Sequence, residues 1–228
     1  MHTETLPFHA PAARRMVSVP PPRRATATVG DLFDVMGVPM QFARNEEVYG
    51  AGEPADYLYK VKSGCVRTYT VSADGRRQIG SFYLPGDVFG FEADDAHSLS
   101  AEAIVSGTVQ VVKRAALTAR AAGDASVARL LLDLTCGELR RAQDHIGLLV
   151  RSAAERVAGF LLALAKREGS ATEVVLPMSR QDIADYLGLT IETVSRTLTQ
   201  LESTATIALP SARRVVLRNA AALRGLAA

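Results

Sequence analysis

The sequence predicts an α+β protein made of an antiparallel β-roll, a long helix and a C-terminal winged helix-turn-helix, in that order. Three observations predict this architecture. Short apolar segments alternate with turn residues from Gln41 to about Val112, a helical apolar repeat without proline runs from about Asp124 to Leu149, and two capped helices flank a glycine between Met178 and Leu198. We divide the 228 residues into an arm (1–28), a β-roll domain (29–123), a long helix (124–149) and a winged-helix domain (150–228).

Composition narrows the class of protein. No stretch approaches the roughly 18 apolar residues that span a bilayer, and no apolar segment follows the N-terminal arginines as in a secretory signal, so we expect a cytoplasmic protein without membrane contact. Cys65 and Cys136 lack metal-ligand spacing, and we expect buried structural thiols, with a redox sensor as the alternative. A net charge of +2 is only weakly basic, so the evidence for nucleic-acid binding must come from geometry.

The arm of residues 1–28 contains the run Pro20-Pro21-Pro22 followed by Arg23 and Arg24. Such a composition cannot build a core, so we expect a flexible, solvated tail. The alternative is that its arginines touch DNA or a partner.

The β-roll is predicted from short strands separated by turns. The expected strand segments are 48–49, 58–61, 65–70, 78–84, 88–89, 103–105 and 109–112, and the breaks include Ser63-Gly64 and Pro85-Gly86-Asp87. Many short strands with this spacing are typical of a sandwich or barrel.

The long helix carries two apolar stripes, so it needs two surfaces to pack against. The first stripe is Val127, Leu130, Leu131, Leu134, His145 and Leu148, and the second is Leu132, Cys136, Leu139, Ala142, Ile146 and Leu149. We expect one stripe to pack on its own β-roll and the other on the same helix of a second chain, which makes the protein a homodimer. The alternative is a helix buried twice within one monomer. We assign the partner contact to Val127, Leu131, Leu134, Arg141, His145 and Leu148.

Three capping signals set the C-terminal helices. Ser152 with Glu155 forms a capping-box pattern at the start of one helix, which ends at Gly169 before a short strand over 174–176. Ser179 caps the next helix, and Gly188 suits a sharp turn with positive φ. Thr190 then caps the second helix of a helix-turn-helix, in which Ala184 and Val194 face inward.

The outer face of that second helix is the candidate DNA-reading surface. Ile191, Glu192, Ser195 and Arg196 remain outside at its N-terminal end, where a recognition helix meets base edges in the major groove. Arg196 can pair with guanine and Glu192 can accept from cytosine. The alternative for this i, i+4 pair is a solvated salt bridge.

Other polar residues flank this surface. Arg180, Thr190 and Thr193 are candidate contacts to the DNA backbone. The segments 207–208 and 213–217 predict a hairpin that forms the wing, from which Arg213 and Arg214 would also reach the backbone.

From Gln41 onward the chain resembles the Crp/Fnr superfamily of bacterial regulators, and within it the FixK branch. The resemblance rests on Asp74-Gly75-Arg76-Arg77-Gln78, Leu84-Pro85-Gly86-Asp87, Ser100-Ala101-Glu102-Ala103-Ile104 and the stretch from Ser179 to Arg196. It implies that the roll is cyclic-nucleotide-binding-like and that the long helix dimerises. It also implies that Glu192, Ser195 and Arg196 read TTGA-type half-sites in double-stranded DNA, and that RNA polymerase is a partner in activation. The FixK branch further implies control of genes for oxygen limitation or nitrogen oxides.

The sequence departs from other branches of that superfamily. Leu99 and Ser100 stand where cyclic-nucleotide sensors have an Arg-Ser or Arg-Thr pair, so we expect no cyclic AMP response. The chain has no N-terminal cysteines for an iron-sulfur cluster, and we expect no cofactor and no metal. The segment 202–206 lacks the glycine that is usual before the wing.

Three other functions remain as alternatives. A ligand-gated sensor would use the roll for an unidentified small molecule. A metal enzyme would need clustered ligands, which His2, His9, His97 and His145 cannot supply within the roll, so we do not expect an enzyme. A protein-binding adaptor would use the winged helix without DNA, and the salt dependence of binding separates it from a DNA-binding protein.

Overall fold

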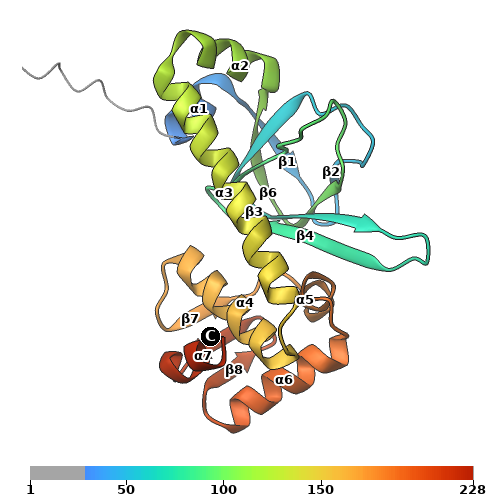
Figure 1. Ribbon diagram of the computed structural model, residues 1–228, viewed down its shortest axis with the longest axis vertical. Helices are drawn as coiled ribbons and strands as arrows, with labels where there is room; N and C mark the ends of the chain where they lie inside the picture. Colours follow the sequence, from blue (N-terminus) through green and yellow to red (C-terminus); the bar gives the residue numbers. More distant parts are fainter. Residues whose placement is uncertain (1–28, 228) are drawn as a thin grey trace, which may run out of the picture.

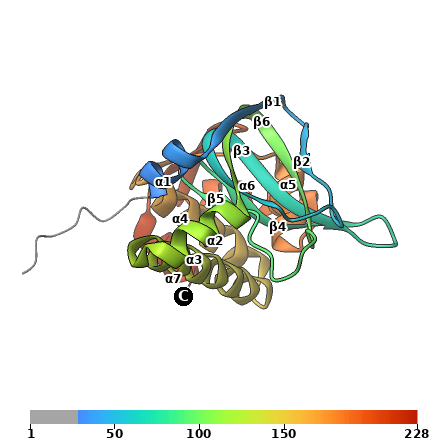
Figure 2. The ribbon, with the colours of Figure 1, turned by 90° about the horizontal axis from the view of Figure 1, so that it is seen from above.

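The computed structural model describes residues 29–227, so the expectations for the arm of residues 1–28 lie outside the described residues. A six-stranded β-roll lies at one end of the molecule, and a helical domain with a small sheet lies at the other. The long helix α3 (Ala125–Leu149) runs from the far end of the roll toward the helical domain (Figure 1). Seen along this direction, α3 lies on one side of the roll and the β3–β4 hairpin projects from the other (Figure 2).

The roll is an antiparallel sheet in the order β1-β6-β3-β4, with β2 paired to β6 and β5 paired to β3. Its strands are β1 (Val38–Phe42), β2 (Glu47–Tyr49), β3 (Tyr57–Val71), β4 (Arg77–Tyr83), β5 (Val88–Phe89) and β6 (Ser100–Lys113). The segments 58–61 and 65–70, expected as separate strands, form one continuous strand, β3. The segments 103–105 and 109–112 likewise belong to the single strand β6. These two strands bend together where their register shifts near Ser63 and Cys65. A Cβ at Gly107 would lie 2.1 Å from the Ser63 carbonyl oxygen, so this close approach requires glycine.

Two helices that the sequence analysis did not identify close the upper end of the roll. They are α1 (Val29–Met36) and α2 (Arg114–Gly123). Phe33 and Leu117 are fully buried there with Val127 of α3 in one apolar cluster. Both helices are short, at eight and ten residues, and so give a pattern search only two to three turns to detect.

Helix α3 begins at the N-cap Asp124, whose carboxylate accepts from the Ser126 amide. The chain itself covers the two stripes of α3 to different extents. All six residues assigned to the partner contact also meet residues of their own chain: Val127, Leu131 and Leu134 pack on the roll, Arg141 lies 3.5 Å from Asp87, His145 stacks on Tyr186, and Leu148 packs against the helical domain. The second stripe faces outward instead, with Leu132, Leu139 and Ile146 about three-fifths exposed. Sequence periodicity identified both stripes but carried no information on which of them meets the chain's own roll.

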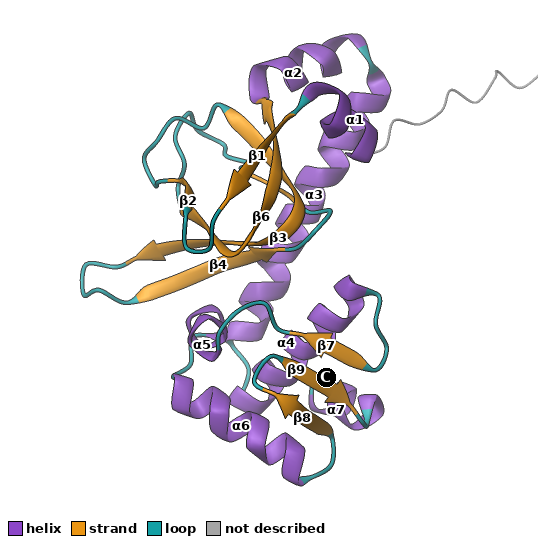
Figure 3. Ribbon diagram, turned by 180° about the vertical axis from the view of Figure 1, so that it is seen from behind, coloured by secondary structure: helices purple, strands orange, loops and turns teal. Residues whose placement is uncertain are grey.

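The helical domain contains α4 (Ala153–Glu168), α5 (Arg180–Leu187), α6 (Ile191–Ser203) and α7 (Ala220–Leu226) around a three-stranded sheet (Figure 3). The capping predictions are confirmed. Ser152 and Glu155 form a complete capping box, and Gly169 ends α4 with φ +65°. The sheet has the order β7-β9-β8, formed by β7 (Glu173–Val175), β8 (Ile207–Ser211) and β9 (Arg214–Leu217), which confirms the expected hairpin.

Ala205 takes the place of the missing glycine before the wing. Its φ is +53°, and its amide donates to the Glu202 carbonyl while the Thr206 amide donates to the Leu201 carbonyl. This is the Schellman arrangement that ends α6 and turns the chain into β8. The wing therefore forms without glycine, but it holds an alanine in the left-handed region.

The roll and the helical domain share one apolar core. Cys65, Ile79, Phe82 and Ile104 of the roll lie in the same buried cluster as Phe160 of α4 and the inner faces of α5 and α6. Within residues 29–227, no helix is both long and apolar enough to cross a membrane.

Candidate nucleic-acid interface

Helices α5 and α6 form the predicted helix-turn-helix. Gly188 ends α5 with φ +61°, and Thr190 begins α6 by accepting from the Thr193 amide at 3.2 Å. Ala184 and Val194 are fully buried where the two helices meet. The small Ala184 lets the helices approach closely, and the turn fixes where α6 points.

The N-terminal turns of α6 present the four predicted base-reading residues. Glu192 and Arg196 are exposed, Ser195 is half-buried, and Ile191 keeps 37% of its surface exposed. The opposite face of the helix, with Leu198 and Leu201, is buried in the core. The structure therefore brings the predicted residues together on one accessible surface.

Glu192 is held in its charged form. Hydrogen bonds from its own amide and from the Thr190 side chain lower the pKa of its carboxyl, and Arg196 adds a smaller effect. Among the ion pairs of residues 29–227, none joins Glu192 to Arg196, so the geometry does not support the solvated salt-bridge alternative. Both side chains are free to face a ligand.

The predicted backbone contacts divide into two groups. Thr190 and Thr193 lie at the start of α6 with their hydroxyls 3.1 Å apart, and Arg180 is half-buried at the start of α5. The two wing arginines are already engaged: Arg213 donates to the Pro177 carbonyl at 3.3 Å, and Arg214 forms an ion pair with Glu173. Each of these contacts uses one of the five N–H donors of a guanidinium, so both exposed side chains keep donors for DNA.

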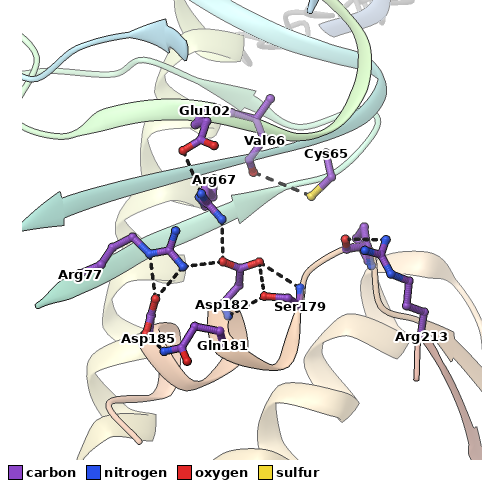
Figure 4. A network of polar contacts seen from close by, with 11 residues as sticks. Cys65, Val66, Arg67, Arg77, Glu102, Ser179, Gln181, Asp182, Asp185 and Arg213 are labelled. Carbon is purple, nitrogen blue, oxygen red and sulfur yellow. Dashed lines mark hydrogen bonds and ion pairs between the residues drawn. The ribbon is translucent and has the colours of Figure 1, made fainter. Parts of the chain in front are cut away.

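A polar network that sequence analysis missed lies behind this surface. Asp182 of α5 is 5% exposed and receives guanidinium groups from Arg67 and Arg77 of the roll (Figure 4). The partners lie more than 100 positions apart in the chain, since Arg67 and Asp182 are separated by 115 residues. Sequence analysis identified only Ser179 here, as the N-cap of α5, and the structure shows that Asp182 completes a capping box with it.

Comparison with known proteins identifies both halves of the chain. Residues 39–130 match the cyclic nucleotide-binding domain, and residues 155–226 match the Crp-like helix-turn-helix domain. The chain is 53% identical over 207 residues to the nitrogen fixation regulation protein FixK of Azorhizobium caulinodans, covering 88% of this chain and 84% of the relative. The chain belongs to the Crp/Fnr family, in its FixK branch. It is a DNA-binding transcriptional regulator.

Two further comparisons agree with the FixK assignment. The solved structure of FixK2 from Bradyrhizobium japonicum is 50% identical and superimposes with a TM-score of 0.81, covering 85% of this chain and 98% of the other. The fumarate and nitrate reduction regulatory protein of Salmonella typhimurium is 32% identical over 191 residues, covering 81% of this chain and 76% of the relative.

Aromatic side chains gather inside the roll of this FixK-type regulator. An aromatic cluster of Tyr49, Tyr59, Tyr83, Phe89 and His97 occupies its interior, with the Tyr49 and His97 rings stacked 3.5 Å apart. Burial of Tyr49 and Tyr59 raises the pKa of both phenols, to about 12 for Tyr59, so neither ring is ionised at neutral pH.

Glu92 and Ser100 are engaged in hydrogen bonds within the roll. Glu92 accepts from the Ser98 amide and hydroxyl at 3.1 and 3.0 Å. The Ser100 hydroxyl accepts from the Ala51 amide, and Leu99 contacts the sheet at Gly80. Leu99 and Ser100, at which the sequence analysis noted the absence of an Arg-Ser pair, are thus both engaged within the roll.

Proposed function

We propose that this FixK-type regulator binds palindromic TTGA-type sites as a homodimer and activates transcription under oxygen limitation or nitrogen-oxide stress. The observation that carries the proposal is the exposed face of α6, on which Glu192 and Arg196 stand free of each other at the end that a recognition helix inserts into the major groove. Arginine to guanine and glutamate to cytosine are base contacts that such a face makes. The names of the relatives, a nitrogen fixation regulator and a fumarate and nitrate reduction regulator, support the physiological setting.

The homodimer is supported by the outward stripe of α3. Leu132, Leu139 and Ile146 recur every seven residues with exposures of 61%, 59% and 63%. Thr135 and Ala142 lie between them and Leu149 follows Ile146, which gives the alternating spacing of three and four residues that a coiled-coil seam requires. Three large apolar side chains in a row on one helix favour burial against a second copy, and small residues between them allow close approach of the two helices. This seam replaces the interface assigned from the sequence.

A two-fold axis along α3 explains a palindromic site. Two α6 helices related by this axis would meet successive major grooves about one helical turn, roughly 34 Å, apart. Contact with RNA polymerase is proposed from the family resemblance, since activation of transcription requires it, and we place the protein in the cytoplasm with the bacterial DNA.

The test is a fluorescence anisotropy titration against a duplex that carries TTGA and TCAA half-sites separated by about six base pairs, which sets their centres about one turn apart. A duplex of scrambled sequence and the variant Arg196→Ala are measured in parallel. We expect selective binding without added ligand, and loss of selectivity in Arg196→Ala. Arg140→Ala is the matched control, because it removes the same charge from an exposed position of α3 away from α6. Equal binding of both duplexes by the unmodified protein would overturn the proposal.

A ligand-gated sensor is the second candidate, favoured by an apolar groove in the roll that residues of its interior cluster help to line. The groove has a volume of about 580 Å³ and is lined by Met36, Met40, Phe42, Tyr57 and Tyr59 together with Val38 and Lys113. A ligand bound there at 100 times its dissociation constant would raise the free energy of unfolding by about 2.7 kcal/mol. A thermal-shift screen with small apolar compounds, followed by DNA titration with each hit, distinguishes this candidate from a regulator whose activity follows its abundance.

A further inference from the structure

The contact between the roll and the DNA-binding domain is organised by one buried carboxylate. The Oδ1 atom of Asp182 accepts from Arg67 at 2.6 Å and from Arg77 at 2.7 Å (Figure 4). Its Oδ2 atom accepts from the amide and the hydroxyl of Ser179 at 2.9 and 2.8 Å. Asp182 therefore caps the first helix of the helix-turn-helix and, with its other oxygen, receives two arginines from adjacent strands of the roll.

Each arginine has a second acidic partner that fixes its direction. Arg67 also donates to Glu102 at 2.8 Å, within the sheet. Arg77 also donates to Asp185, one turn further along α5, at 2.8 Å. Because guanidinium groups are planar and donate in a fixed fork, two acceptors on each arginine define an orientation as well as a contact.

The apolar part of the same junction lacks this directionality. Ile79 and Phe82 of the roll pack against Phe160 and other core residues of the helical domain. Apolar packing holds surfaces together but is not directional, whereas buried ion pairs contribute little net stability and are best attested as devices that select one arrangement. The apolar core therefore stabilises the contact between the two domains, and the ion pairs select the angle at which α5 meets the sheet.

That angle determines where α6 points. Helix α5 is joined to α6 by the three residues Gly188 to Thr190, and Val194 of α6 is fully buried, so the two helices move as one unit. The roll is held on α3, which carries the outward seam. A rotation of α5 on the roll would therefore shift α6 relative to the two-fold axis. Adding one base pair to the spacer displaces a half-site by about 3.4 Å along the DNA and about 35° around it, so the position of α6 decides which spacer fits.

We propose that Asp182 and Arg77 are positioning residues for DNA recognition: the contact between them sets the separation of half-sites that the dimer accepts. Neither residue needs to touch DNA for this role. The inference rests on the proposed binding of a palindrome by a homodimer. It adds that the roll acts as the fixed frame for the reading helix.

The experiment measures the affinity of the full-length protein for three duplexes that share the same half-sites. One has the optimal spacer, and the others have a spacer one base pair shorter or longer. We expect the unmodified protein to bind the altered spacers at least about tenfold more weakly than the optimum, since a displacement of this size removes base contacts worth about 1–3 kcal/mol each. We define the spacing ratio as the affinity for the optimal spacer divided by the affinity for an altered spacer. In Arg77→Gln and Asp182→Asn we expect affinity for the optimal spacer to fall while affinity for the altered spacers does not, so that this ratio approaches one.

Three controls separate this role from loss of folding. Arg76→Gln changes the adjacent arginine, whose side chain is 86% exposed and pairs only with Asp74, and should keep the spacing ratio of the unmodified protein. Arg77→Lys retains the charge without the fork and should restore part of the ratio. Circular dichroism and thermal unfolding show whether each variant is folded at the assay temperature.

The outcomes are distinct. If the unmodified protein does not separate the palindrome from a scrambled duplex, the proposed function fails. If it does, and folded Arg77→Gln and Asp182→Asn keep its spacing ratio, the positioning role is wrong even though the proposed function stands. Should Asp182→Asn prove unfolded, Arg77→Gln decides, because its side chain is a quarter exposed and its loss leaves the capping box of α5 intact.

Discussion

The imidazole of His145 lies flat on the phenol ring of Tyr186, with ring centroids 3.9 Å apart and planes 5° apart. Its Nε2 atom donates to the Tyr186 carbonyl oxygen at 2.6 Å. His145 belongs to α3, the candidate dimerisation helix, and Tyr186 belongs to the last turn of α5. The pair therefore joins the long helix directly to the helix-turn-helix.

This pair predicts a pH dependence of stability. Burial lowers the pKa of His145 below its usual 6.5, which outweighs the opposing effect of its hydrogen bond. The unfolded chain thus takes up a proton near pH 6.5 that the folded chain accepts only at lower pH, so the free energy of unfolding falls as the pH drops below about 6.5. The free energy of unfolding, measured by urea titration at several pH values between about 5 and 8, should change less with pH in His145→Asn than in the unmodified protein. Asparagine can still donate to Tyr186 but cannot be charged. If the variant keeps the pH dependence of the unmodified protein, His145 is not the cause of that dependence.

Ala205 predicts a stabilising substitution. An L-residue in the left-handed region costs about 1–2 kcal/mol, and glycine removes this cost while losing more backbone entropy on folding. We expect Ala205→Gly to raise the free energy of unfolding by about 0.5–1 kcal/mol, and the melting temperature by about 1–4 °C for a chain of this size. Ala122→Gly, at an exposed position of α2, should instead destabilise by up to about 1 kcal/mol, and calorimetry of both variants checks the sign.

Glu192 and Arg196 predict separable changes in sequence preference. Arg196→Ala should weaken binding by about 1–3 kcal/mol, roughly 5- to 150-fold, and equalise affinities for duplexes that differ only at the guanine of the half-site. Glu192→Gln should relax preference at a different base pair. Competition binding with singly substituted duplexes tests both, and a uniform loss over all duplexes would instead indicate phosphate contacts.

The outward stripe of α3 predicts the position of the dimer seam. Leu139→Asp places a charge where two copies are expected to meet and should give folded monomers in analytical ultracentrifugation. DNA affinity should fall by at least about 10²-fold, because two linked half-sites become independent. Arg140→Glu, one position along the helix and also exposed, should remain dimeric. A dimer that survives Leu139→Asp would place the interface elsewhere.

The two cysteines should differ in reactivity. Burial raises the pKa of the Cys65 thiol to about 12, whereas Cys136 is exposed on α3, contrary to the expectation that both are buried. Because the thiolate is the reactive form, Ellman's reagent should modify one thiol of the folded protein quickly and the second only after denaturation. Cys136→Ser should abolish the fast phase. A fast phase that persists in this variant would contradict the burial of Cys65.

The sequence alone determined the features that depend on residues close together in the chain. The capping boxes at Ser152 and Ser179, the turn at Gly188 and the outward face of α6 follow from side chains within one or two helical turns of their partners. This local chemistry was enough to predict the helix-turn-helix, its four candidate base-reading residues and the order of the parts.

Only the tertiary structure decided how those parts meet. The two stripes of α3 are equally apolar in sequence, and the roll selects the one with Val127 and Leu131 because that side faces Phe33 and Leu117. Asp182 looks like a capping residue until the fold brings Arg67 and Arg77 to its other oxygen, from 115 and 105 positions away. Interactions over such separations leave no periodic trace in a single sequence, because they depend on how strands and helices pack and not on residue spacing.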